Sequence, residues 1–529
     1  MKIQTLTVNP FTLADFYKYS HILMYPPKTE QVFSTWTPRD MSLNPAKPYS
    51  PVLSIRADGP ESPERATGFA GNADDGVVVF GVQAALLKLR EIWEHGFFDR
   101  SYISVFAEFE HIYKTSLGAD VPPEWKDAIY SLHVLGHLPI EVRALPEGTL
   151  CPCKVPYLTI TNTDPRFGWL TNFLETMLST SLWLPASSAT QTYYLRTLVN
   201  KYAIETGLSE DDMNFTLHDF SMRGMANIEA GMASGAAHLL SSWGTDTISA
   251  FNYIKAYYGG ELGEDYQAFS VPASEHSVMS SWGPDNEREL FEWLLTERFP
   301  SGILSVVSDT WDLWKVIGEY LPGLRDTVMK RDGKLVIRPD SGDPVLILCG
   351  DPDGETEIEK KGAVEALWDI FGGVINQEGY KTLDPHIGLI YGDAINYTRA
   401  DEILKRLKAK GFAANNVVFG IGSYTYQYQT RDTFGFALKS TAAVVDGTYR
   451  EIFKDPATDR DSVKKSQRGF VGVSDKLALI DKMNPEKYRS FNERGLNALD
   501  VVYRDGKLLR VERYSDIRDR LWSQYVEGE

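Results

Sequence analysis

Short apolar runs alternate with longer amphipathic segments through the middle of the chain, and this alternation predicts a parallel α/β fold. Each run has the length of a strand buried on both faces, and each amphipathic segment places apolar residues at helical spacing. The predicted strand and helix pairs are residues 214–220 and 228–242, 268–271 and 287–299, 303–307 and 311–321, 334–337 and 363–371, 387–390 and 398–410, with a last strand at 417–419. Six strands in series favour a closed α/β barrel over an open sheet.

The pattern is different on either side of this region. A helix is predicted at residues 81–96, strands from about residue 132 to 162, and a long helix at residues 169–206. After Phe434 two alternating segments flank Asp446-Gly447, which is a hairpin turn signal.

These patterns predict an α/β protein with two parts. We expect a parallel α/β barrel at residues 186–434 and a second α+β domain built from the N-terminal residues 1–185 and the C-terminal residues 435–529.

Composition narrows the class of protein. The chain has 529 residues, 43% of them hydrophobic, and 54 basic against 72 acidic side chains give a net charge of −18. This acidity argues against nucleic acid as a partner, although a local basic pocket for a phosphorylated small molecule remains compatible with it. Three cysteines, no signal-peptide pattern and no apolar run of about 18 residues predict a cytoplasmic protein without a membrane partner.

Polar residues follow the predicted strands, where parallel α/β proteins build their sites. Taken singly, each has an ordinary reading: a lone His is usually structural, and Pro, Asp, Ser and Gly form turns. Together, Arg, Asp, Ser and Gly on one rim suit an anionic phosphorylated ligand with Mg²⁺. The segments are His218-Asp219-Phe220, Glu275-His276-Ser277, Ser308-Asp309, Arg338-Pro339-Asp340, Gly392-Asp393 and Gly420-Ile421-Gly422-Ser423.

The motifs resemble those of the nicotinamide phosphoribosyltransferases, in the type II phosphoribosyltransferase family. The resemblance runs in order from about residue 12 to 519 and is most specific in the Ser-Glu-His-Ser and Ile-Arg-Pro-Asp-Ser-Gly motifs. It is carried by His218-Asp-Phe-Ser-Met-Arg223-Gly, Gly244-Thr-Asp246, Ser274-Glu-His276-Ser, Ile337-Arg-Pro-Asp-Ser-Gly342, Gly392-Asp393 and Phe453-Lys-Asp-Pro456.

The resemblance implies transfer of a phosphoribosyl group from phosphoribosyl pyrophosphate to nicotinamide, with Mg²⁺ and stimulation by ATP, in NAD salvage. Phe220 would stack on one face of the nicotinamide and Tyr17, in segment 12–27 of a second subunit, on the other, which implies a homodimer with shared active sites. Asp246 would be a buried carboxylate that accepts the carboxamide N–H and repels nicotinic acid.

Further residues are implied for the phosphates and the ribose. Those of the barrel are Arg223, Ser305, Arg338, Pro339, Gly392, Asp393, Gly422 and Ser423, and those reaching into the partner's site are Arg431, Lys439 and Lys454.

The resemblance also implies a catalytic group centred on His276, which ATP would phosphorylate. Glu275 and Asp309 would be the nearby carboxylates, and Asp309 would orient the imidazole of His276. Asp340 would contact ribose hydroxyls or a metal-bound water. The Mg²⁺ ligands stay open.

Four departures bear on the phosphate contacts: Ala394 and Ile421 stand where the family has glycine, Tyr424 follows in the same loop, and Ala437 stands where a serine is expected. Two alternatives stay open, a nicotinate phosphoribosyltransferase and a catalytically silent binding protein.

Overall fold

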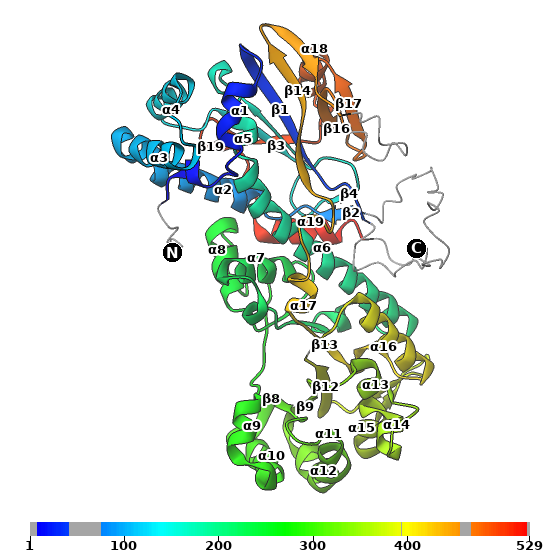
Figure 1. Ribbon diagram of the computed structural model, residues 1–529. Helices are drawn as coiled ribbons and strands as arrows, with labels where there is room; N and C mark the ends of the chain where they lie inside the picture. The colour runs from blue at the N-terminus through cyan, green and yellow to red at the C-terminus, as the bar shows by residue number, and fades with distance from the viewer. Residues whose placement is uncertain (1–7, 42–75, 393, 455–466, 526–529) are drawn as a thin grey trace, which may run out of the picture.

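The computed structural model describes residues 8–41, 76–392, 394–454 and 467–525, and the chain forms two lobes (Figure 1). The upper lobe in Figure 1 holds the first and last parts of the chain, and the lower lobe holds the middle part. Each lobe has its own apolar core. Trp93 and Trp125 are fully buried in the upper core, and Leu335 and Phe419 are fully buried in the lower one.

An antiparallel sheet of seven strands forms the centre of the upper lobe, in the order β15-β14-β1-β5-β3-β18-β19. These strands are β1 (Thr29–Thr37), β3 (Ile140–Ala144), β5 (Leu158–Asn162), β14 (Ala437–Val445), β15 (Thr448–Glu451), β18 (Asp500–Arg504) and β19 (Lys507–Leu508). Strand β1 pairs with β5 on one side and with the C-terminal β14 on the other. The expected α+β layer shared by N- and C-terminal segments is therefore confirmed.

Strands β14 and β15 form the expected hairpin. Its turn residues Asp446 and Gly447 have φ values of 50° and 71°. Positive φ at both positions gives the turn type that matches the twist of paired strands, which explains why Asp-Gly stands there.

One expectation for the upper lobe is wrong, and one strand was not predicted. Residues 132–135 are the last turn of helix α4 (Pro123–Leu135), which ends at Gly136 with φ 76°, and strand β3 begins only at Ile140. Strand β1 is central to the sheet but was not among the predicted strands. Short apolar runs fit a helix or a strand equally well, so only packing distinguishes them.

Helix α6 (Glu175–Glu205) runs between the lobes for 31 residues, with Pro185 inside it. A Cβ at Gly81, just before α2 (Val82–Trp93), would lie 2.7 Å from the Cβ of Pro185, so this close packing requires glycine. The proposed domain boundary at residue 185 falls within this continuous helix. The remaining α-helices of the upper lobe are α1 (Lys18–Met24), α3 (Tyr102–Leu117), α5 (Leu170–Phe173), α18 (Pro485–Glu493) and α19 (Tyr514–Trp522).

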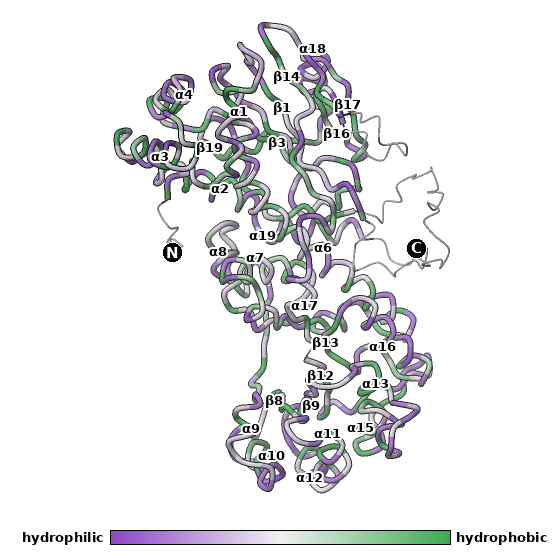
Figure 2. The backbone as a smooth tube through the Cα atoms, viewed as in Figure 1, coloured by the Kyte–Doolittle hydropathy of each residue, from purple (hydrophilic) through white to green (hydrophobic). Residues whose placement is uncertain are grey.

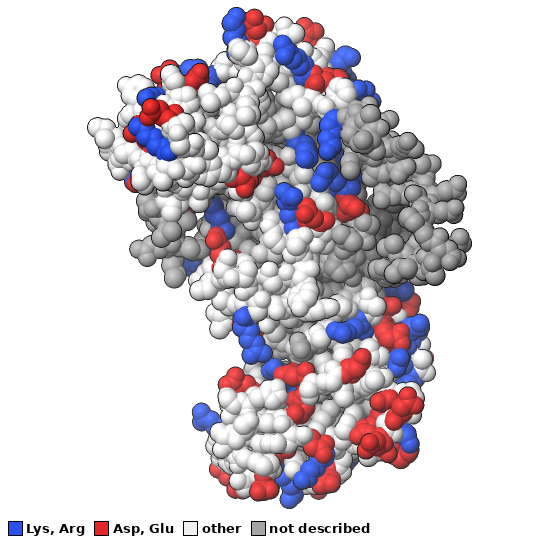
Figure 3. All heavy atoms as spheres, in the orientation of Figure 1, with Lys and Arg blue, Asp and Glu red and all other residues white. Residues whose placement is uncertain are grey.

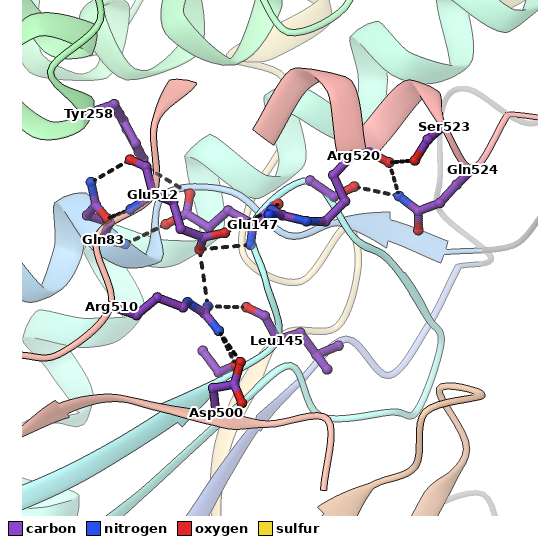
Figure 4. Close-up of polar contacts among 12 residues, drawn as sticks. Gln83, Leu145, Glu147, Tyr258, Asp500, Arg510, Glu512, Arg520, Ser523 and Gln524 are labelled. Atoms are coloured by element: carbon purple, nitrogen blue, oxygen red, sulfur yellow. Dashed lines mark hydrogen bonds and ion pairs between the residues drawn. The ribbon is translucent and has the colours of Figure 1, made fainter. Parts of the chain in front are cut away.

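A buried polar network joins the C-terminal segment to α2 and to α8 (Ser249–Tyr258) (Figure 4). The Glu147 carboxylate accepts hydrogen bonds from the Gln83 N–H (2.6 Å) and the Tyr258 hydroxyl (2.8 Å), and Glu512 accepts one from Arg520 Nη1 (2.8 Å). Burial, and then the neighbouring charge of Glu512, raise the pKa of Glu147 to about 7.

The lower lobe contains a parallel sheet in the order β7-β6-β13-β12-β9-β8. Its strands are β6 (Leu217–Asp219), β7 (Gly244–Thr245), β8 (Ser301–Val307), β9 (Asp332–Arg338), β12 (Ile387–Tyr391) and β13 (Val418–Ile421). The predicted strand at 268–271 is an extended segment that makes single parallel bridges, Phe269 to Gly244 of β7 and Ala273 to Ser305 of β8. These bridges span the gap between the two edge strands, so the sheet curls as a barrel does.

Helices surround this sheet on the outside (Figure 1). In Figure 2 the strands β12 and β13 are largely hydrophobic, whereas the outer turns near α15 and α16 are hydrophilic, as expected for a covered parallel sheet. The helices are α7 (Ile228–His238), α9 (His276–Trp282), α10 (Glu287–Trp293), α11 (Leu313–Lys315), α12 (Leu321–Lys330), α13 (Pro344–Cys349), α14 (Glu357–Lys361), α15 (Ala363–Phe371), α16 (Tyr397–Ala409) and α17 (Ser423–Tyr426). Within the described ranges, no helix has the length and hydropathy needed to cross a membrane.

Candidate active site

The imidazole of His276 and the carboxylate of Asp309 face each other at the rim of the barrel. His276 is the first residue of α9 and half exposed, whereas Asp309 follows β8 and its side chain is only 4% exposed. His276 Nε2 lies 3.3 Å from Asp309 Oδ1, which is buried and has no hydrogen-bond partner among the described residues. Nε2 is therefore the ring nitrogen on the side of Asp309, at ion-pair distance but without a hydrogen bond.

The other oxygen of Asp309 is held firmly. Its Oδ2 accepts hydrogen bonds from the Asp340 N–H (2.8 Å), the Ser341 N–H (2.7 Å) and the Ser341 hydroxyl (2.5 Å). Three donors on one oxygen hold the Asp309 carboxylate in a fixed position.

Arg338 and Asp340 form a two-pronged ion pair beside it, with Nε to Oδ1 at 3.0 Å and Nη2 to Oδ2 at 2.8 Å. A Cβ at Gly392, at the end of β12, would lie 1.9 Å from Asp340 Oδ1, so only glycine fits against the pair. The guanidinium fork of Arg338 is therefore engaged by the Asp340 carboxylate.

Phe220 lies between this ion pair and the strands β6 and β13. The Arg338 guanidinium is 5.0 Å from the centre of its ring, and the His218 ring centre is 4.8 Å away. A Cβ at Gly420 would lie 2.7 Å from the Phe220 ring, so this glycine allows the ring to approach β13. The half-buried ring thus lies at the rim, in contact with Arg338 and with β13.

Asp246 lies beside Phe220 and is held by two donors. Its Oδ1 accepts hydrogen bonds from His218 Nε2 (2.9 Å) and Ser270 Oγ (2.5 Å). Burial acts to raise the pKa of Asp246, but the hydrogen bonds from His218 and Ser270 and the charge of Arg338 outweigh it and hold that pKa below its usual value. The expectation of a buried carboxylate is wrong: the side chain is 42% exposed, because it stands at the open end of the sheet.

The other candidates of the barrel lie on the same rim. Arg223 is exposed and makes no hydrogen bond or ion pair with the described residues, whereas Glu275 is exposed and accepts a hydrogen bond from Ser277. Ser305 and Pro339 are buried, Gly422 has open space where a Cβ would stand, and the Ser423 side chain packs on Gly224. Asp393 lies outside the described residues.

Four candidates lie in the upper lobe instead. Tyr17, just before α1, is 57% exposed, and the basic residues Arg431, Lys439 and Lys454 lie on and near β14 (Figure 1). Partial burial, and then the positive charges of Arg39, Lys454 and Arg431, lower the pKa of Lys439. Arg39, Arg431, Lys439 and Lys454 therefore form one basic cluster. In Figure 3 basic side chains gather over β14.

Four members of these groups had no role predicted from the sequence: His218 and Ser341, which lie within the motifs, and Ser270 and Arg39. His218 could have been found, because residues two apart on a strand share a face and His218 precedes Phe220 by two. Nothing in the sequence links Arg39 to Lys439.

The four departures have different consequences. Ala394 has φ 57°, a left-handed conformation that suits glycine. Ile421 and Ala437 are buried in the cores, and Tyr424 is 41% exposed beside Arg399. Of the four residues, only Ala394 therefore has a strained backbone, in the loop after β12. The Ile421 side chain is buried and does not narrow the loop after β13.

No group of three or more His, Cys, Asp or Glu side chains placed to hold a metal occurs among the described residues. Mg²⁺ commonly binds through one or two carboxylates, waters and substrate phosphates. Of the rim carboxylates, Asp309 has one oxygen, Oδ1, without a hydrogen-bond partner among the described residues, whereas both oxygens of Asp340 are paired with Arg338.

Known proteins resemble this chain over nearly its whole length. The nicotinamide phosphoribosyltransferase of Acinetobacter baylyi is 41% identical over 530 residues, covering 98% of each chain. That of Xanthomonas campestris pv. campestris is 32% identical over 516 residues, covering 95% of this chain and 96% of the relative. A solved structure, nicotinate-nucleotide pyrophosphorylase from Pyrococcus furiosus, shares the fold with a TM-score of 0.53 at 15% identity, over 99% of this chain and 98% of that one.

The curled parallel sheet and its rim define an α/β-barrel phosphoribosyltransferase, a class of pentosyltransferase enzymes. The family model of the nicotinate phosphoribosyltransferase (NAPRTase) family matches residues 215–506. The chain belongs to this family.

Proposed function

We propose that the protein is a nicotinamide phosphoribosyltransferase, which makes nicotinamide mononucleotide and pyrophosphate from nicotinamide and phosphoribosyl pyrophosphate in NAD salvage. The names of the two relatives support this substrate, since both cover more than nine-tenths of the chain. The observation that carries the proposal is the charged Asp246 carboxylate beside the Phe220 ring.

Asp246 selects the amide in this proposal. His218 and Ser270 occupy Oδ1, so Oδ2 is the acceptor for the carboxamide N–H of a base stacked on Phe220. The lowered pKa keeps Asp246 ionised at neutral pH, and an ionised carboxylate repels the carboxylate of nicotinic acid. A nicotinate phosphoribosyltransferase, the alternative within the family, is disfavoured for this reason.

Arg338 and Arg223 bind the pyrophosphate, and the loops at Gly392 and Ser423 receive the phosphoribosyl 5′-phosphate. The bond from ribose C1 to the pyrophosphate oxygen breaks as the pyridine nitrogen attacks C1, and the electron pair leaves with the pyrophosphate. The guanidinium groups stabilise that departing charge. Mg²⁺, when bound with the pyrophosphate, supplies further neutralisation of its charge.

His276 accepts the γ-phosphoryl group of ATP on Nδ1, because Asp309 faces Nε2. The P–O bond to ADP breaks as the N–P bond forms, and the fixed Asp309 carboxylate stabilises the cationic imidazole ring. Glu275 and Asp340 lie beside it as acceptors for the hydroxyls or metal-bound waters of the substrate.

Two copies of the chain complete each site. Tyr17 is exposed next to Lys18, which is 2% exposed and forms a 2.6 Å ion pair with Glu175, so the ring is presented outward from a fixed base. Tyr17 of the partner would cover the second face of the base, and the partner's basic cluster would approach the phosphates. A cytoplasmic location is proposed with this activity, consistent with three free thiols.

One assay tests the proposal: purified protein with phosphoribosyl pyrophosphate, Mg²⁺ and ATP, supplied with nicotinamide or nicotinic acid. Product from nicotinamide is expected, and turnover of nicotinic acid alone would refute the proposal. Absence of turnover with either base would favour a silent binding protein.

A further inference from the structure

Arg399 lies in the first turn of α16, against the loop that follows β12. The helix begins after Asn396, whose side chain accepts a 2.9 Å hydrogen bond from the Arg399 backbone N–H. The Arg399 guanidinium turns back to the loop, where Nη1 donates a 2.5 Å hydrogen bond to the Ala394 carbonyl oxygen. This arginine is not among the residues that the sequence predicted to bind a substrate.

Most of the Arg399 guanidinium has no partner. One of its five N–H groups donates to the loop, and the other four have no acceptor among the described residues. The half-buried side chain forms no ion pair with a described carboxylate. The two acidic residues that follow it in α16 are engaged elsewhere. Asp401 accepts a 2.9 Å hydrogen bond from the Tyr202 hydroxyl, and Glu402 accepts one of 2.7 Å from Arg406. A partly desolvated cation with unused donors favours an anion with oxygen acceptors.

Tyr424 holds the same guanidinium from the other side. The guanidinium carbon of Arg399 lies 5.9 Å from the centre of the Tyr424 ring, which packs in turn on Tyr428 with ring centres 4.6 Å apart. Tyr424 belongs to α17, which follows β13. This cation–π contact is the second attachment of Arg399, so the cation is held between the loops after β12 and β13.

These two loops are joined to each other and border an open space. The Thr425 hydroxyl of α17 donates a 2.7 Å hydrogen bond to the Ile395 carbonyl oxygen in the loop after β12. Gly422, at the end of β13, has no atom within 4 Å of the place where a Cβ would stand. Arg399 therefore stands beside the loops that receive the phosphoribosyl 5′-phosphate in the proposed function.

We infer that Arg399 binds the 5′-phosphate of phosphoribosyl pyrophosphate, an assignment that rests on the proposed function. Its guanidinium fork can donate two parallel hydrogen bonds to phosphate oxygens. It would supply a donor that the chain lacks at Ala437, which is buried and stands where a serine is expected. Asp340, which lies against Gly392, is paired with Arg338, so its charge is neutralised beside this phosphate.

The test measures the binding of ribose 5-phosphate and, separately, of pyrophosphate with Mg²⁺ to the whole protein by isothermal titration calorimetry. Ribose 5-phosphate carries the 5′-phosphate without the pyrophosphate. Arg399→Gln should weaken its binding at least about tenfold, since charge-assisted hydrogen bonds are lost, and should leave the affinity for pyrophosphate unchanged. In turnover, the same variant should raise the KM for phosphoribosyl pyrophosphate about as much, with kcat and the KM for nicotinamide unchanged.

Two further variants sharpen the result. Arg399→Lys keeps the charge but not the fork and should bind ribose 5-phosphate with intermediate affinity. Arg406→Gln, which breaks the pair with Glu402 on the same helix, is the matched control and should bind both ligands as the native protein does.

Three outcomes would overturn the inference: an affinity for ribose 5-phosphate that is unchanged in Arg399→Gln, an equal loss of affinity for pyrophosphate, or no saturable binding of ribose 5-phosphate by the native protein. Absence of turnover together with binding of ribose 5-phosphate that depends on Arg399 would contradict the proposed function alone. The two failures are therefore distinguishable.

Discussion

Replacing Asp246 with Asn tests how the enzyme would distinguish an amide from an acid. The change keeps the shape and the acceptor oxygen for His218, but it removes the negative charge that faces the base. Nicotinamide would lose a charge-assisted hydrogen bond, which contributes about 1.5–3 kcal/mol. Nicotinic acid would be relieved of repulsion between two carboxylates about 4 Å apart, which costs about 1 kcal/mol in water and about 4 kcal/mol at an effective dielectric of 20.

Because the Asp246 side chain is 42% exposed, the lower values apply. Their sum, about 2.5 kcal/mol, corresponds to a decrease of at least about 50-fold in the ratio of kcat/KM for nicotinamide over nicotinic acid. The assay is steady-state turnover of each base at fixed phosphoribosyl pyrophosphate, Mg²⁺ and ATP. Asp127→Asn, an exposed carboxylate on α4, is the control for net charge. A ratio that does not change in Asp246→Asn would show that base selection lies elsewhere.

Three further predictions follow from particular contacts. His276→Ala should abolish ATP hydrolysis and leave slow phosphoribosyl transfer. The control His386→Ala, which breaks a 2.7 Å His–Asp pair away from the rim, should keep both activities. ATP hydrolysis that persists in His276→Ala would contradict the phosphohistidine. Ala394→Gly should raise the free energy of unfolding, measured by chemical denaturation, by about 0.5–1 kcal/mol, because the φ of Ala394 is 57°. The control Ala409→Gly in α16 should lower the free energy of unfolding. A less stable Ala394→Gly variant would refute the backbone strain at this position. Folding raises the pKa of Glu147, so its contribution to the free energy of unfolding is complete below about pH 4 and is lost as the pH rises through 7. The free energy of unfolding of Glu147→Gln, relative to that of the native protein, should therefore increase by on the order of 2 kcal/mol between pH 5 and 8. Parallel curves of stability against pH for the two proteins would argue against a neutral carboxyl.

The order of strands and helices in the barrel was predictable because each element carries its own periodicity. Residues 363–371, for example, are both the predicted helix and α15. The hairpin at Asp446-Gly447 was also predictable, since its turn conformation excludes most other residues. Strand β1 was not, because its place in the sheet depends on β5 and β14, which are more than a hundred residues away in the chain.

The site was predictable as a set of positions but not as a set of contacts. Strand ends located His276, Asp309 and Arg338 on one rim, whereas nothing local shows that Asp309 is held by three donors or that Arg338 is paired with Asp340. The exposure of Asp246 was predicted wrongly, because burial depends on how far the neighbouring segments extend beyond the strand end.

The class of fold, the rim that carries the polar candidates and the family of the chain could all be recognised in the amino-acid sequence. Local periodicity and short motifs encode these features, since they depend on neighbours in the chain. Which side chains meet depends on the tertiary structure, as in the basic cluster of Arg39, Arg431, Lys439 and Lys454 and in the hydrogen bond from Tyr258 to Glu147. Packing brings together residues that are more than a hundred positions apart in the chain, and no local sequence pattern encodes such a contact.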